Sequence, residues 1–220
     1  MRSRSVLALL ACVIAGCSTP DTQNPPETDT ENAADVRLGP FTRSASEADL
    51  IAAFGASNVV RSEVALYAGR CAPGSVLFSG TPDQVDVIWA DSSYTRPAQA
   101  RFSSPGSRWR ASSDLHVGMS LEALVEANEG EPVTFAGFGW EDGGLGIWPQ
   151  SPSNTQAGRL VFELAPDSAS YAEAVKSSRF DSVIGPQEVL SDNPALEGMS
   201  IHVARLTLYW REPDIQWSCQ

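Results

Sequence analysis

The sequence predicts an α+β protein in which two helix-plus-antiparallel-sheet repeats pack as one pseudo-symmetric domain. Apolar residues recur at helical spacing in two segments, 44–60 and 117–133. Each segment leads into several short runs with strand character. Hydrophobic residues make up 42% of the chain and charged residues 19%, which are ordinary globular proportions. We expect the domain to span residues 36–220, with halves of about 36–113 and 114–220.

The first 16 residues have the three parts of a secretory signal peptide. Arg2 and Arg4 are basic, residues 6–15 are almost wholly apolar, and small residues follow. The apolar run is about half as long as the roughly 20 residues that a membrane-spanning helix needs. We therefore expect a cleaved signal peptide over 1–16 rather than a permanent span.

The end of this segment, Ile14-Ala15-Gly16-Cys17, resembles the lipobox of bacterial lipoproteins. The resemblance implies that Cys17 is diacylated on its sulfur and becomes the first mature residue, so that the lipid holds the protein on a membrane. Cys12 matches less well because bulky Leu10 stands where a small residue is preferred. The alternative is an ordinary secreted protein whose signal peptide contains a cysteine.

Ser18 bears on which membrane would hold the lipid. In lipoproteins sorted within a two-membrane envelope, Asp after the lipidated cysteine marks retention in the inner membrane. The same resemblance therefore favours the outer membrane, facing the periplasm.

Residues 17–35 are expected to hold the lipidated Cys17 and a disordered acidic tether. From Ser18 to Asp35 the chain has three prolines and no aromatic, Val, Ile or Leu residue. Such a segment cannot bury enough apolar surface to offset its ordering entropy. A flexible coil of this length would reach roughly 20–30 Å. A peptide motif for a partner is the alternative.

The charge balance limits the partners of the mature protein. The formal net charge is −12, and loss of residues 1–16 removes two arginines and no acid, which leaves −14. Nucleic acids and anionic membrane surfaces both attract positive charge. We therefore expect no nucleic-acid partner.

Two cysteines remain in the expected domain, Cys71 and Cys219. An exported chain meets an oxidising compartment, where an even pair of cysteines indicates a disulfide. Neither stands in a Cys-x-x-Cys motif or beside a histidine, so redox or nucleophilic chemistry is the lesser alternative.

The first half begins with an expected helix. Leu50, Ile51 and Phe54 have helical spacing, Ser44 and Glu47 are placed as a capping box, and Gly55 is a stop signal. Strand-like runs follow at 63–68, 75–78, 84–90 and 98–102.

The second half repeats this order. Ser120 is the expected N-cap, Leu121, Leu124 and Val125 form the apolar stripe, and Gly130 precedes the end. Strand-like runs follow at 133–140, 145–148, 159–164 and 201–210. Before the last run we expect a helix over 168–180 and a long turn-rich loop over 185–198.

The stretch VGMSLEALVEANEGEP resembles the helix that opens repeats in small outer-membrane lipoproteins and in β-lactamase-inhibitor-protein-like domains. The matching residues are Gly118, Met119, Ser120, Leu121, Leu124, Val125, Gly130 and Pro132. In those families a helix pair packs on an antiparallel sheet, and the resemblance implies binding of another protein without catalysis. The first half departs from the pattern, since Pro40-Phe41 and Ser44-Ala45-Ser46 replace the Gly-Met-Ser start.

Few residues point to catalysis. The chain has two histidines, His116 and His202, and no metalloprotease, nucleophile-elbow, phosphate-loop, EF-hand or zinc-cysteine motif. Glu141 and Asp142 are adjacent carboxylates that could act as an acid and a base, although a solvated turn is the simpler interpretation. We expect no catalytic residue, no metal and no cofactor.

Two stretches are candidate binding surfaces. In 135–149, Phe138, Trp140 and Trp148 alternate with glycines, and aromatic side chains are favoured interface anchors. The alternative is a hairpin with internal aromatic packing. In 92–113, four arginines and no acid surround Trp109. The stripe, Arg96, Arg101, Arg108 and Arg110, could meet an acidic partner or pair with the domain's own carboxylates.

These observations lead to one functional hypothesis and two alternatives. The hypothesis is a lipid-anchored envelope protein whose domain binds another envelope protein without catalysis. The alternatives are an enzyme or enzyme inhibitor acting on periplasmic or cell-wall material, and a carbohydrate-binding module that uses the tryptophans.

Overall fold

The computed structural model describes residues 39–111, 114–151 and 158–219, all of which belong to one compact unit, Asn32–Gln220. The expected signal peptide, the lipidation site Cys17 and the tether lie outside the described residues. Within the described part of the chain, no helix is long and apolar enough to cross a membrane.

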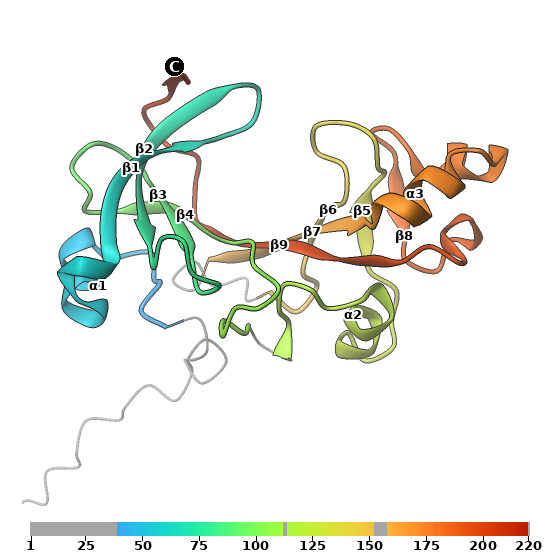
Figure 1. The fold of residues 1–220 in the computed structure, drawn as a ribbon, viewed down its shortest axis with the longest axis horizontal. Coiled ribbons are helices and arrows are strands. Elements are labelled where there is room, and N and C mark those ends of the chain that lie inside the picture. The colour runs from blue at the N-terminus through green and yellow to red at the C-terminus, as the bar shows by residue number, and fades with distance from the viewer. Residues whose placement is uncertain (1–38, 112–113, 152–157, 220) are drawn as a thin grey trace, which may run out of the picture. The chain divides into compact units, whose positions relative to one another are not determined.

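One antiparallel sheet of eight strands dominates the fold (Figure 1). Its strand order is β1–β2–β3–β4–β9–β7–β6, and β10 pairs with β2 outside this path. The strands are β1 (Val59–Ala65), β2 (Arg70–Leu77), β3 (Val85–Trp89), β4 (Pro97–Phe102), β6 (Leu145–Ile147), β7 (Arg159–Pro166), β9 (Ile201–Tyr209) and β10 (Trp217–Ser218).

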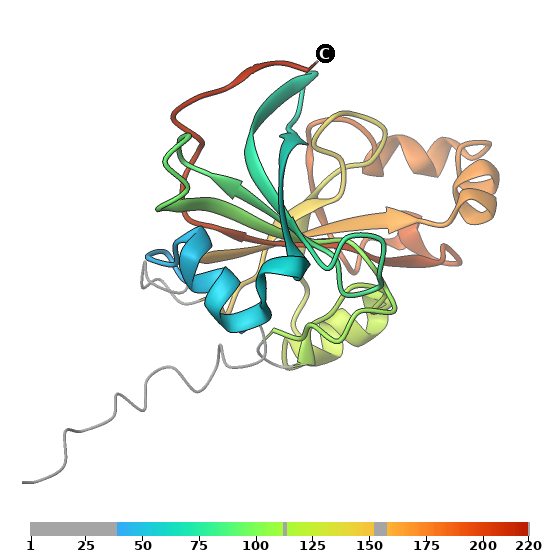
Figure 2. The ribbon, with the colours of Figure 1, turned by 60° about the vertical axis from the view of Figure 1, so that its left-hand side comes forward.

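A second sheet of two strands and a few short helices complete the fold. The small sheet joins β5 (Thr134–Ala136) to β8 (Glu188–Leu190). The α-helices are α1 (Glu47–Phe54), α2 (Leu121–Ala127) and α3 (Ser168–Ala174), and the 3₁₀-helices are η3 (Ala56–Asn58), η5 (Ser178–Val183) and η6 (Pro194–Leu196). Figures 1 and 2 both show α1 and α2 on the same side of the large sheet.

Alternation along the central strands separates a core face from a second face. In β9, Leu206 and Leu208 are buried while Thr207 and Tyr209 are partly exposed, as expected for a strand with one solvated face. Leu50 of α1 joins the same core cluster as these leucines. The helices α1 and α2 therefore cover one face of the large sheet, and the other face carries the site described below.

The two expected N-terminal helices exist, but the cap of the first was wrong. The capping box of α1 joins Ser46 and Asp49: the Asp49 backbone N–H donates to Ser46 Oγ, and the Ser46 N–H donates to Asp49 Oδ2. The expected partner Glu47 is instead buried and points toward the sheet. The N-cap of α2 is Ser120, as predicted.

The predicted fold class was wrong. Among the residues that the structure describes, 33% are strand residues and 20% are helical, so the fold is mostly antiparallel β rather than an α+β pair of helix-plus-sheet repeats. The sheet is continuous because β4 pairs with β9, with Ala100 opposite Leu208. The error arose because sequence patterns reveal local periodicity but not which distant strands pair.

Smaller departures concern the bounds of the elements. β1 begins at Val59, four residues before the predicted strand-like run 63–68. The predicted loop 185–198 contains β8 and η6. The predicted helix 168–180 is α3, which ends at Ala174, with η5 starting at Ser178.

Cys71 and Cys219 form the expected disulfide, with Cα atoms 5.1 Å apart across 148 residues of sequence. Cys71 lies in β2, and the bond ties the end of the chain to that strand. β10 pairs beside it, with Trp217 opposite Cys71 and Ser218 opposite Arg70.

Candidate functional site

The second face of the large sheet carries a groove of about 610 Å³, which we call the central groove. Its floor comes from β4, β9 and β7 and consists of Gln99, Arg101, Arg159, Val161, Thr207 and Tyr209. One wall is the turn between β1 and β2, with Leu66, Tyr67, Ala68 and Arg70. The wall opposite this turn contains Glu141, Asp142 and Leu145, and the end of the groove contains Glu212 and Gln216. In Figures 1 and 2 the β1–β2 turn and the β5–β6 loop rise on the side of the sheet away from α2.

Strand register brings the floor residues together from distant parts of the chain. Arg101 and Val161 both pair with Thr207, from the β4 and β7 sides of β9. Gln99 and Arg159 both pair with Tyr209. Side chains in such cross-strand rows lie on one face of the sheet. The floor therefore presents two rows of side chains across three strands, with Val161 as the apolar member.

Arg101 is the most unusual cation of the groove. Its Nε and Nη2 donate to Gln99 Oε1 at 3.1 and 2.8 Å, and its Nη1 donates to the carbonyl oxygen of Ala65 at 2.8 Å. In the described residues no carboxylate forms an ion pair with it. Burial lowers the pKa of Arg101, and the nearby positive charge of Arg205 lowers it further. A half-buried guanidinium held by neutral acceptors is suited to an external anion.

The tyrosines of the groove stand beside its arginines. The Arg101 guanidinium lies 5.8 Å from the ring centroid of Tyr67, and that of Arg159 lies 5.9 Å from the ring of Tyr209. Burial, together with the hydrogen bond from the Tyr209 hydroxyl to Glu212 Oε1 at 2.8 Å, raises the pKa of Tyr209 to about 12. Both tyrosine rings line the groove beside its arginines and are available for contact with a ligand, and the Tyr209 hydroxyl stays protonated at neutral pH.

An ion pair next to the floor is already satisfied within the chain. Arg205 Nη1 lies 2.9 Å from Glu163 Oε2, and the two residues face each other across β9 and β7. Glu163 Oε2 is buried and has no hydrogen-bond partner among the described residues, so the ion pair with Arg205 is its one polar contact there. Arg159, in contrast, forms no ion pair within the described ranges.

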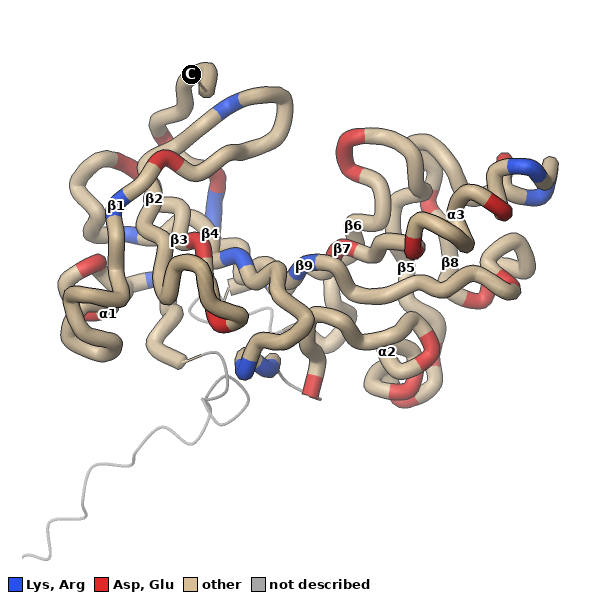
Figure 3. The backbone as a smooth tube through the Cα atoms, viewed as in Figure 1, with Lys and Arg blue, Asp and Glu red and all other residues tan. Residues whose placement is uncertain are grey.

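The charges of the groove are arranged with cations on the floor and acids at the edge. Arg101 and Arg159 lie on the floor, while Glu141, Asp142 and Glu212 line the walls. In Figure 3 the tube of the central strands carries blue segments and the loop before β6 carries a red one. This pattern differs from a uniformly basic patch.

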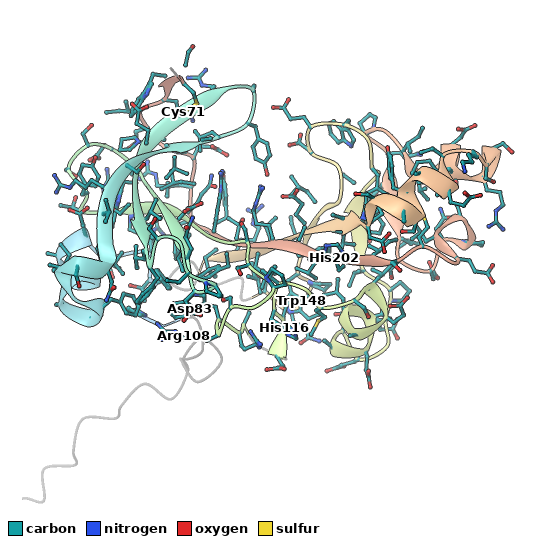
Figure 4. All side chains as sticks on the ribbon, in the orientation of Figure 1. Cys71, Asp83, Arg108, His116, Trp148 and His202 are labelled. Atoms are coloured by element: carbon teal, nitrogen blue, oxygen red, sulfur yellow. A yellow bond between two sulfur atoms is a disulfide. The ribbon has the colours of Figure 1, made fainter. Side chains whose placement is uncertain are left out.

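The predicted arginine stripe does not gather on one surface. Arg108 Nε lies 3.4 Å from Asp83 Oδ2, as Figure 4 illustrates, and its guanidinium lies over the Trp109 ring at 4.7 Å. Arg110 Nη1 donates to the carbonyl oxygens of Ser107 and Trp109. Of the four arginines, Arg101 alone lines the central groove.

Trp109 is part of the core. Only 6% of its surface is exposed, and its Nε1 donates to the carbonyl oxygen of Asp83 at 2.9 Å. Its ring packs against four phenylalanines, Phe41, Phe54, Phe78 and Phe102. Its burial removes it from the surface on which a partner could bind.

The aromatic stretch 135–149 is mainly internal too. Phe138 is 3% exposed and packs against Phe135, and Trp148 is fully buried. Trp140 is 39% exposed, and its Nε1 donates to the carbonyl oxygen of Gly137. One exposed tryptophan remains, so the stretch offers no row of stacking platforms for a glycan.

The histidines do not line the central groove. His116 Nδ1 lies 2.6 Å from the carbonyl oxygen of Asp114, and His202 lies in β9 (Figure 4). Among the described residues no group of three or more His, Cys, Asp or Glu side chains could hold a metal ion.

Sequence reasoning missed most of the groove. Tyr67, Arg159 and Tyr209 drew no attention as site residues, although all three lie in predicted strand-like runs, 63–68, 159–164 and 201–210. Arg101 was noted only as one member of the stripe. The missing information is the strand order, which puts β4 and β7 on either side of β9.

Comparison with known proteins returned no match: no family model, no curated protein and no solved structure matches this chain.

Proposed function

We propose that this protein is a lipid-anchored protein of the bacterial cell envelope that binds another envelope protein through the central groove. Lipidation at Cys17 would hold the domain on a membrane, with the outer membrane facing the periplasm favoured by Ser18. The acidic segment to Asp35 would keep the domain away from the lipid surface.

The observation that carries the binding role is the pair of arginines on the groove floor. Arg101 and Arg159 line one concave surface, and neither forms an ion pair in the described part of a strongly acidic chain. Arg101 is partly buried and held in place by the neutral acceptors Gln99 and Ala65, so its side chain loses little further entropy when it meets an anion, and Arg159 adds an exposed cation beside it. The groove volume, about 610 Å³, is in the range of known ligand sites.

The test is site-directed photocrosslinking in native membranes. A photoreactive amino acid replaces Val161 on the groove floor in one strain and Arg43, in the segment before α1, in another. Mass spectrometry then identifies the crosslinked proteins. We expect one recurrent protein adduct from position 161 and none from position 43.

Substitutions link the adduct to the arginines. Arg159→Ala should reduce the adduct at position 161 at least fivefold, because it removes an exposed floor cation, and Arg43→Ala should leave the adduct unchanged. No adduct at position 161, or the same adducts at both positions, would contradict a protein partner at the groove.

One observation favours a second candidate, an enzyme acting on envelope material: the adjacent carboxylates Glu141 and Asp142 line the same groove. Such an enzyme would release product from purified cell-wall material, and Glu141→Gln would abolish the release. Arg43→Ala is the matched control and should keep full activity.

A further inference from the structure

We propose that the central groove takes an extended peptide segment of mixed charge, in which one acidic side chain meets Arg101 and Arg159 and basic neighbours meet the acids of the groove walls. This inference rests on the proposed function and adds the chemistry of the partner. On this basis the central groove selects a ligand by the order of its charges and does not bind every anion.

The arginines of the groove floor indicate that one part of the ligand is an anion. The Arg101 guanidinium uses three of its N–H groups on Gln99 and Ala65, and its remaining donors have no acceptor in the described residues. From strand and row spacing, the Cα atoms of Arg101 and Arg159 lie roughly 12 Å apart. Two arginine side chains of ordinary length can converge across that distance on one carboxylate.

The walls exclude a dense polyanion. Glu141 and Asp142 stand on one side of the groove and Glu212 stands near its end. In a chain of formal charge −12, these acids would repel a polyphosphate, a nucleic acid or a polyuronate. A segment with one acid between two basic residues matches floor and walls together.

The apolar parts of the groove favour a polypeptide over a free anion. Leu66, Val161 and Leu145 line it beside the rings of Tyr67 and Tyr209. A small inorganic anion would leave these surfaces uncovered. In an extended peptide alternate side chains lie on the same side at about 6.8 Å intervals, so a central acid can face the floor while the basic residues two positions away on either side reach the walls.

The first experiment varies the peptide and leaves the protein unchanged. The purified full-length protein is titrated by fluorescence anisotropy against a labelled library of nine-residue peptides that carry Glu, Lys or Gln at three alternate positions, with Ser or Ala between. We expect Lys-x-Glu-x-Lys peptides to bind best. Replacing the central Glu by Gln should weaken binding at least tenfold, and Glu-x-Glu-x-Glu peptides should bind no better than the Gln peptide.

The second experiment varies the protein. Arg159→Ala and Arg101→Gln should each reduce the preference for Glu over Gln at the central position to less than threefold. Arg43→Ala is the matched control and should keep the tenfold preference. Arg159 is exposed, so its variant keeps the test valid if Arg101→Gln proves unstable by near-ultraviolet circular dichroism.

Removal of the wall charges tests the other half of the proposal. The double variant Glu141→Gln/Asp142→Asn should lose the advantage of the flanking lysines and accept Glu-x-Glu-x-Glu peptides. Inorganic phosphate and a trigalacturonate serve as competitors, and we expect no displacement by either at 1 mM.

The outcomes separate this inference from the proposed function. Preference for the polyacidic peptides, equal binding of the Glu and Gln peptides, absence of any peptide binding, or displacement by phosphate or trigalacturonate would each overturn the mixed-charge peptide. A protein adduct at position 161 together with any of these results would leave a protein partner in place and reject its proposed chemistry. Absence of that adduct would reject the protein partner itself.

Discussion

Glu47 lies in the first turn of α1 with its carboxylate turned toward the sheet. The residue is 7% exposed, and its Oε1 accepts a hydrogen bond from Ser75 Oγ at 2.7 Å. Its Oε2 lies 2.6 Å from Arg61 Nη2. Trp89 Nε1 donates to the same Ser75 Oγ at 2.9 Å. This network joins α1 to β1, β2 and β3, so one carboxylate connects four elements.

Replacement of Glu47 by Gln should therefore destabilise the domain. The amide keeps the shape but loses the ion pair and puts an N–H donor where Glu47 has an acceptor oxygen facing the donor of Arg61 or Ser75, so we expect a loss of about 1–3 kcal/mol in the free energy of unfolding. Urea unfolding at pH 7 measures it. Glu188→Gln, at an exposed position of β8, is the control and should change the free energy by less than about 0.5 kcal/mol.

The same residue predicts an acid dependence. Burial alone raises the pKa of Glu47, but the hydrogen bonds from Arg61 and Ser75 outweigh it and hold the pKa below its ordinary value. A lowered pKa in the folded state means that the stabilisation is complete above about pH 4.5 and is lost as the pH falls through the lower folded value. Wild type should lose more stability than Glu47→Gln between pH 5 and pH 3. Parallel pH profiles for the two proteins would contradict this.

At the scale of elements, the loop between β5 and β6 depends on a close backbone approach at Gly144. Its φ is +83°, and a Cβ there would lie 2.0 Å from the carbonyl oxygen of Leu164. The N–H of Gly144 donates to Ala136 O at 2.7 Å, and its carbonyl accepts from the N–H of Leu164 at 2.9 Å. Gly144 thus holds β5, β6 and β7 together just after the acids Glu141 and Asp142.

Gly144→Ala should destabilise the domain more than Gly198→Ala. Gly198 has nearly the same φ, +82°, but a Cβ there would meet only open space. Comparison of the two variants therefore separates the cost of the steric clash with Leu164 from the cost of backbone strain. We expect about 1–2 kcal/mol at Gly198 from strain and an additional loss of about 1–3 kcal/mol at Gly144 from overpacking. Chemical denaturation of both variants measures the difference. Equal losses would show that the approach to Leu164 can relax.

The helix α2 and the strand β9 show which structural features can be predicted from local sequence patterns. The apolar stripe and Ser120 cap predicted α2 because both signals are local, and the strand-like run 201–210 predicted β9. The pairing of β4 with β9 joins residues about 100 positions apart, and no local pattern carries it. The groove floor depends on this pairing, which is why Arg101 was noticed without Arg159.

At the scale of the whole molecule, the disulfide ties the C-terminal segment against the central groove. Glu212 and Gln216 line the groove, and the Cys71–Cys219 bond follows within a few residues. Arg70 Nη2 donates to the carbonyl oxygen of Gln216 at 3.4 Å, and Trp217 Nε1 donates to Glu63 Oε1 at 2.9 Å. The bond therefore supports both stability and one wall of the groove.

Reduction of the disulfide should lower the thermal midpoint and weaken peptide binding together. Opening a loop of 148 residues removes up to about 5 kcal/mol in the chain-entropy model. Differential scanning fluorimetry and anisotropy, with and without a phosphine reductant, measure the two effects. The double variant Cys71→Ser/Cys219→Ser is the control and should not respond to the reductant. A fall in midpoint with unchanged affinity would assign the bond to stability alone.

The proposed lipid anchor would be a further determinant of function, because a groove of modest affinity would gain from confinement at the membrane where its proposed partner is held. A single acyl chain gives reversible membrane binding, while two or more give a stable anchor, at about 0.8 kcal/mol per buried methylene. Confinement raises the effective concentration of groove and partner without any new contact.

Cys17→Ala should therefore abolish incorporation of an alkyne-bearing palmitate analogue and release the protein from membranes, while Cys12→Ala, within the expected signal peptide, should leave both unchanged. Labelling of the Cys17→Ala protein, or loss of labelling in the Cys12→Ala protein, would move the lipid away from Cys17. If Cys17→Ala releases the protein, the photocrosslink at position 161 should fall in the same strain even though the groove is intact, and this coupled loss would tie the anchor to the binding function.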